Sequence, residues 1–223
     1  MELLLYFAAI VIVMLAQSAV QGAYRKYSQI STYRGMTGAQ VARQILDRYG
    51  CRDVEIEYAV GGTLSDHYDP KRHIVRLSPD IHDGDSIASV SVAAHECGHA
   101  IQHAENYGFI ALRNTILPFA MVSSQFSWIV LFGGLMLDLA GLFYLGILML
   151  SCVALFQLAT LPLELDASSR AMKIINDEGF VMEDERADVK AMLTAAAFTY
   201  IAALLSSLLQ IFRMIIRFNR NND

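Results

Sequence analysis

Four long apolar segments constrain the fold of this chain more than any other feature. They are Leu3–Val20, Ile116–Met136, Leu139–Thr160 and Ala191–Ile216. Each is close to the roughly 20 residues that a helix needs to cross a hydrocarbon core of about 30 Å. Hydrophobic residues make up 55% of the chain and charged residues 17%, and the mean hydropathy is +0.39, which soluble domains seldom show. We therefore predict a mainly α integral membrane protein with about four transmembrane helices.

The first apolar segment has two interpretations, a cleaved signal peptide or a membrane anchor. Met1 and Glu2 provide no basic region before it, which a signal peptide normally has, so we expect an anchor. The basic and aromatic residues Tyr24–Tyr27 that follow are typical of a membrane surface. Residues 1–23 are thus expected to form the first transmembrane helix.

The polar region after this anchor predicts short helices and a small sheet. A capping box at Thr37–Gln40 opens a short helix. Asp53–Tyr58 alternate polar and apolar residues and favour a half-buried strand, and a second strand is expected at His73–Leu77 after a turn. A longer helix should run from about Ser86 to about Glu105.

This longer helix contains two histidines, His95 and His99, with Glu96 directly after the first. Such spacing is the signature of a zinc hydrolase. Positions i and i+4 project from one helix face about 6 Å apart, so both imidazoles can bind one ion at about 2.0–2.1 Å. Glu96 lies one step around the helix, where a general base can reach a water on the metal without binding the metal itself.

The alternative interpretation is that both histidines are hydrogen-bonded in a core and that Glu96 pairs with a Lys or Arg. Small residues around the motif favour a metal site, because they allow close packing about the helix. These residues are Ala93, Ala94, Gly98 and Ala100.

A catalytic zinc site commonly has three protein ligands and a water, so a third ligand is needed. His103 lies about 12 Å along the helix from His95 and is rotated off the shared face, so we interpret it as a polar residue at the helix end. Two apolar segments joined by a short tip at Asp138 carry the chain across the membrane and back. The polar stretch at 162–190 therefore lies on the correct side to complete the site.

Glu164 is the candidate third ligand in this stretch, and Asp166 is its rival. Pro162 suits the first turn of a helix, so we expect a new helix to start there and Glu164 to project just outside the bilayer. For both acids the alternative is a helix N-terminal carboxylate without a role at the metal, favoured by the helix dipole.

Three segments of the chain together resemble a known family. They are Leu64–Pro70, His95–Glu105 and Leu161–Ala171, and they resemble the neutral zinc metallopeptidases of bacterial membranes, the YugP type. The chain is also distantly similar to the HtpX and CAAX prenyl protease group. That resemblance implies an endopeptidase at the membrane whose site is completed by a glutamate in a Glu-x-x-x-Asp pattern, here beginning at Glu164. Ser168 stands where the pattern has Asp, which puts the expected outer contact in doubt.

The favoured functional interpretation is a membrane-embedded zinc-dependent endopeptidase. One zinc ion held by His95, His99 and Glu164 would activate a water, with Glu96 as the general base. The substrate peptide would lie extended against an edge strand of the small sheet. The alternative is a non-catalytic zinc-containing membrane scaffold or adaptor. Glu96 argues against it, because a structural site closed by a fourth protein ligand needs no base.

Other features exclude some functions and leave others open. The net charge is −5 and the basic residues do not cluster, so we expect a peptide substrate and a lipid bilayer as partners and no nucleic acid. The odd cysteine count, with no CxxC, implies no disulfide framework, and Cys97 should be a small buried residue. His67 is interpreted either as a turn histidine or as a residue that stabilises an oxyanion.

These assignments divide the chain and orient it in a bacterial cell membrane. After the first helix we expect a catalytic region at 24–115, a transmembrane hairpin at 116–160, the third-ligand segment at 161–190, and the fourth helix with its tail at 191–223. Basic residues near the catalytic segments predict a cytoplasmic catalytic face with both termini outside. Those residues are Arg25, Lys26, Arg34, Arg113, Arg170 and Lys173, and Arg213, Arg217 and Arg220 oppose them.

Overall fold

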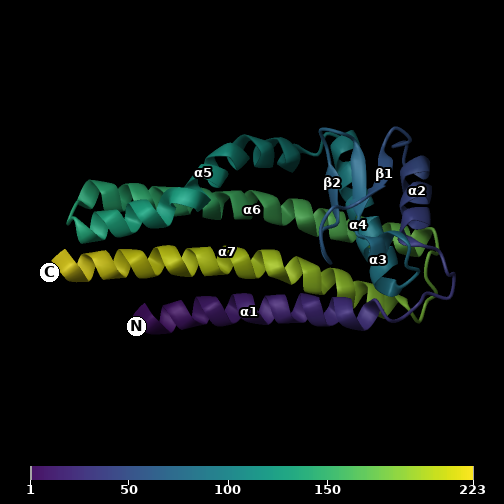
Figure 1. The fold of residues 1–223 in the computed structure, drawn as a ribbon, viewed down its shortest axis with the longest axis horizontal. Helices are drawn as coiled ribbons and strands as arrows, with labels where there is room; N and C mark the ends of the chain where they lie inside the picture. Colours follow the sequence, from purple (N-terminus) through teal and green to yellow (C-terminus); the bar gives the residue numbers. More distant parts are fainter. Residues whose placement is uncertain (1, 223) are drawn as a thin grey trace. The chain divides into compact units, whose positions relative to one another are not determined.

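The computed structural model describes residues 2–222 and consists mainly of helices, with one small sheet (Figure 1). Four of the described helices are long and apolar enough to cross a membrane. They are α1 (Glu2–Tyr27), α5 (Gly108–Met136), α6 (Ala140–Asp177) and α7 (Arg186–Asn222). The predicted fold class, a mainly α membrane protein with four spanning helices and a small β-sheet, is therefore confirmed.

Pro162 does not begin a helix, so that prediction was wrong. Helix α6 continues without interruption through Pro162. A proline inside a helix removes one backbone hydrogen bond and crowds the preceding turn. Long membrane helices tolerate this loss, because neighbouring groups satisfy the freed carbonyl. Glu164 accordingly lies in the interior of a long helix and not in the first turn of a new one.

The chain forms two compact units. The first is made of residues 2–17, 108–162 and 198–222, and the second of residues 18–107 and 163–197. In the first unit α5 and α6 approach closely at glycines, since a Cβ added at Gly146 would lie 2.7 Å from Cβ of Leu131. Nearby, the rings of Phe143 and Phe218 stack with centroids 4.3 Å apart.

The second unit contains a three-stranded sheet. Its strands are β1 (Glu55–Tyr58), β2 (His67–Asp69) and β3 (Ile74–Leu77), in the order β1-β3-β2. Strand β1 pairs with β3 in parallel, and β2 pairs with β3 antiparallel. The predicted strands correspond to β1 and β3. Strand β2 was not predicted, because three residues are too few to show an alternating pattern.

Helices α2 (Gly38–Arg48) and α4 (Ile87–Ala104) pack against this sheet in the second unit, and α3 (Pro79–His82) packs against both of these helices. Helix α2 begins with the predicted capping box, and α3 is a single turn. Helix α4 is capped by Ser86 and lies within a few residues of its predicted limits. It is largely buried, and Cys97 is fully buried with its thiol 3.6 Å from the carbonyl oxygen of Ala42, which confirms the prediction for this cysteine.

Candidate metal centre

The two histidines of the motif lie on α4, and the acidic candidate lies on the part of α6 that belongs to the same unit. One turn of helix separates His95 from His99, so both side chains leave the same face. Gly98, between them, allows the helices to approach closely. A Cβ at Gly98 would lie 2.9 Å from the carbonyl oxygen of Ala167. This close approach brings Glu164 to the two imidazoles.

The ligand atoms of His95, His99 and Glu164 lie within 4.8 Å of one another. Oε2 of Glu164 is 3.3 Å from Nε2 of His95 and 3.4 Å from Nε2 of His99. Two ligands bound tetrahedrally at about 2.0–2.1 Å are separated by about 3.3–3.4 Å. The two separations from Glu164 are thus those of ligand atoms around one small metal ion.

The chemistry of the three donors also fits zinc. Two imidazole nitrogens and one carboxylate oxygen form a ligand set that catalytic zinc sites use, with a fourth position left for water. Oε2 of Glu164 is buried and has no hydrogen-bond partner among the described residues. Its near neighbours are the two imidazole nitrogens, and a metal ion at this point would bind all three atoms.

Glu96 is buried next to the two histidines, with 8% of its surface exposed. Burial raises the pKa of Glu96 above its ordinary value, while the charges of His95 and His99 act in the opposite direction. A carboxylate with a raised pKa is a stronger base, which suits a group that must accept a proton near neutral pH.

The pKa of His99 reflects the acidic groups around it. Burial lowers this pKa, but the adjacent Glu164 carboxylate and the charge of Glu96 outweigh burial and raise it to about 9. At neutral pH His99 therefore carries a hydrogen on both ring nitrogens. A bound metal ion would displace one of them.

Each histidine has a polar neighbour at its second ring nitrogen. Oγ of Ser168 lies 3.2 Å from Nδ1 of His95. The sequence left a contact at position 168 in doubt, because Ser stands there in place of Asp. The structure has this contact, and the Ser168 hydroxyl makes it to His95. Oε1 of Gln102 lies 2.9 Å from Nδ1 of His99. Sequence reasoning missed Gln102, although its position three residues after His99 places it next to that side chain on the helix surface.

The structure places Asp166 and the other histidines away from the three ligand atoms. Oδ2 of Asp166 accepts hydrogen bonds from Gln102 and Arg170. Nδ1 of His103 lies 2.9 Å from the hydroxyl of Tyr68, and burial raises the pKa of Tyr68 to about 12. His67 is exposed, and its Nδ1 contacts the carbonyl oxygen of Ser65.

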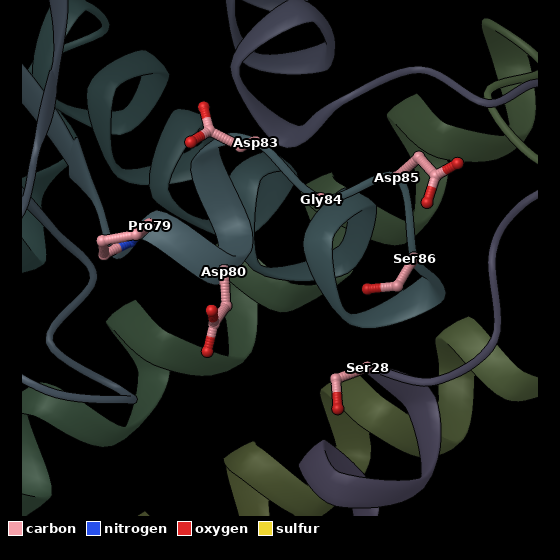
Figure 2. Close-up of a pocket in the computed structure, with 7 residues that line it drawn as sticks. All are labelled: Ser28, Pro79, Asp80, Asp83, Gly84, Asp85 and Ser86. Atoms are coloured by element: carbon pink, nitrogen blue, oxygen red, sulfur yellow. The ribbon is translucent and has the colours of Figure 1, made fainter.

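A separate cavity of about 570 Å³ in the same unit contains none of the candidate ligands. Its carboxylates point in different directions and not toward a common centre (Figure 2). Asp83 accepts a hydrogen bond from Tyr58, and Asp85 accepts one from Ser31. We therefore assign no site to this cavity. Its lining residues are Ser28, Pro79, Asp80, Asp83, Gly84, Asp85 and Ser86.

Comparisons with known proteins agree with this geometry. Residues 2–219 match the model of a family described as "Putative neutral zinc metallopeptidase". The chain is 46% identical over 208 residues to "Putative membrane protease YugP" of Bacillus subtilis (strain 168), which covers 93% of this chain and 92% of the relative. No solved structure matches the chain.

Proposed function

Because the chain belongs to the neutral zinc metallopeptidase family, we propose that it is a membrane-embedded endopeptidase that hydrolyses peptide bonds with one zinc ion. The observation that carries this proposal is the convergence of His95, His99 and Glu164. Their donor atoms lie within 4.8 Å of one another, the oxygen of Glu164 lies 3.3 and 3.4 Å from the two imidazole nitrogens, and this oxygen makes no hydrogen bond to any other described residue.

In this proposal each residue of the centre has a distinct task. His95, His99 and Glu164 hold the ion, which when bound would polarise the scissile carbonyl and lower the pKa of a water to about 7. Glu96 accepts a proton from that water and later donates it to the leaving amine nitrogen. The burial of Glu96 supports this role, because it makes the carboxylate a stronger base.

The substrate would bind as an extended peptide along strand β2. This strand lies at an edge of the sheet, and an edge strand can pair with a peptide backbone of almost any sequence. The contact between Tyr68 of β2 and His103 of α4 supports β2 over β1, because it links this edge to the helix that carries His95 and His99.

Removing the metal tests the proposal. The purified chain in detergent should cleave an unstructured peptide, lose this activity on exhaustive chelation and regain it when zinc is added. A non-catalytic zinc-containing scaffold would bind the ion but show no cleavage in any of these states. Cleavage that persists after chelation, with zinc undetectable, would contradict metal catalysis.

A further inference from the structure

The side chain of Gln102 contacts the immediate surroundings of two candidate ligands. Gln102 is fully buried in α4. Its Oε1 lies 2.9 Å from Nδ1 of His99. Its Nε2 lies 2.8 Å from the carbonyl oxygen of Leu163 and 2.8 Å from Oδ2 of Asp166. Since Leu163 directly precedes Glu164, one amide contacts both His99 and the backbone that carries Glu164.

The donor and acceptor rules fix the orientation of this amide. A carbonyl oxygen and a carboxylate oxygen only accept hydrogen bonds, so both N–H groups of Gln102 point toward Leu163 and Asp166. Oε1 must then face His99. Because Oε1 cannot donate, Nδ1 of His99 carries the hydrogen and donates it. Nε2 of His99, which lies 3.4 Å from Glu164, is therefore the nitrogen that remains to bind a metal.

We infer that Gln102 is a positioning residue that sets the tautomer and ring orientation of His99 and also holds the α6 backbone beside Glu164. This inference rests on the proposed function, since it requires that His99 and Glu164 bind zinc. The hydrogen bond to a ligand histidine usually goes to a carboxylate, a backbone carbonyl or water. In this chain a neutral amide makes it and uses its own N–H groups to reach the second helix.

The neighbours of Gln102 keep it in this orientation. Oδ2 of Asp166 also accepts from Nε of Arg170 at 2.6 Å, and Nη1 of Arg170 lies 2.7 Å from Oε2 of Glu105. Glu105 is the C-cap of α4, so the chain of contacts begins and ends on the same helix. Oδ2 of Asp166 thus receives donors from both Gln102 and Arg170, so the side of the amide that faces Asp166 is its N–H side.

The two histidines are held differently as a result. The partner of His95 is the hydroxyl of Ser168, and a hydroxyl can donate or accept. This contact does not fix the tautomer of His95. The amide of Gln102 does fix the tautomer of His99, so the loss of Gln102 should affect metal binding more than the loss of Ser168.

Three variants test this role. Gln102→Leu has a similar volume and removes all three hydrogen bonds. Gln102→Glu keeps an oxygen toward His99 but has no N–H for Leu163, and it places two carboxylates together at Asp166. Adding Asp166→Asn to Gln102→Glu supplies an N–H to the new carboxylate. By itself Asp166→Asn keeps an oxygen that can accept from the amide of Gln102 but removes the charge that pairs with Arg170, so this variant measures the effect of losing that charge alone.

The measurement is a titration of the full-length chain in detergent with Co²⁺, whose visible absorption reports both affinity and coordination geometry. We expect Gln102→Leu and Gln102→Glu to bind Co²⁺ about 10–100-fold more weakly with altered spectra, and Asp166→Asn to restore binding in the Gln102→Glu background. Ser91→Ala is the control, because Ser91 is also fully buried in α4 and its hydroxyl donates to Ile87 within that helix.

The outcomes separate this inference from the proposed function. Wild-type affinity and spectrum in folded Gln102→Leu would overturn the inference and leave the zinc site intact. If Gln102→Leu does not fold, equally weak binding by Gln102→Glu and its double variant with Asp166→Asn would overturn it. A wild-type chain that binds neither Co²⁺ nor Zn²⁺ would contradict the inference and the proposed function together. A purely structural Gln102 would lower stability without moving the spectrum of the folded protein.

Discussion

Two acidic residues of α6, two positions apart, have different surroundings. Glu164 has a buried oxygen between the two imidazoles, whereas Asp166 is bound to Gln102 and Arg170. A carboxylate that binds a metal supplies a coordination bond. A carboxylate that hydrogen-bonds to the surroundings of a ligand only positions that ligand. The difference in surroundings therefore predicts different effects of removing each side chain.

Glu164→Ala should strongly weaken zinc binding and abolish hydrolysis, because it removes one of the three protein ligands. Asp166→Ala should reduce metal affinity by at most about 10–100-fold, since it acts through Gln102. Zinc stoichiometry and cleavage of one peptide can be compared in both purified variants. Full zinc occupancy and activity in Glu164→Ala, with both lost in Asp166→Ala, would show that Asp166 is the ligand.

At the scale of elements, the separation between α4 and α6 determines whether the centre can form. Gly98 leaves no room for a side chain, since a Cβ there would lie 2.9 Å from a backbone oxygen and 3.3 Å from Cα of Ala167. Backbone atoms in the middle of a packed helix cannot move aside cheaply. We therefore expect the positions of the ligands on the two helices to depend on this glycine.

Gly98→Ala should move α6 away from α4, lower the free energy of unfolding by about 1–3 kcal/mol and weaken zinc binding. Gly133→Ala is a matched control in a helix, because a Cβ there meets only the side chain of Leu142 at an ordinary 3.5 Å. Thermal unfolding and zinc titration of both variants check this. A Gly98→Ala chain with wild-type zinc affinity would mean that the close approach is not needed for the centre.

The elements also show what the sequence could and could not predict. Hydrophobic runs, a capping box and the two-histidine motif are local patterns, so the spanning helices, α2 and α4 were predictable. The continuation of α6 through Pro162 was not, because a proline within an apolar helix looks the same as one at a helix start. The hydrogen bonds of Gln102 to Leu163 and Asp166 join residues more than 60 positions apart, and no local pattern indicates them.

At the scale of the whole molecule, the basic residues predict the side of the membrane that each loop occupies. We propose that the catalytic segments face the cytoplasm, because Lys and Arg flank the spans on that side, while the turn between α5 and α6 has neither. That turn includes Leu137, which is exposed. The catalytic side includes Gly62, where an added side chain meets nothing within 4 Å.

Single introduced cysteines test this orientation in intact cells. A membrane-impermeant thiol reagent should label Leu137→Cys rapidly and Gly62→Cys only after the cells are permeabilised. The wild-type chain is the control for its own cysteines, two of which are buried. Rapid labelling of Gly62→Cys in intact cells would reverse the assignment.

We propose that this membrane protein hydrolyses peptides with a zinc-activated water and that Glu96 is the base. Replacing Glu96 by Gln tests it most directly, because the amide has the same size but cannot accept the proton. The Glu96→Gln chain should keep its fold and one zinc ion, and its turnover of an unstructured peptide should fall by about 10²–10⁴-fold or more. Near-normal turnover by a zinc-replete Glu96→Gln preparation would contradict the account.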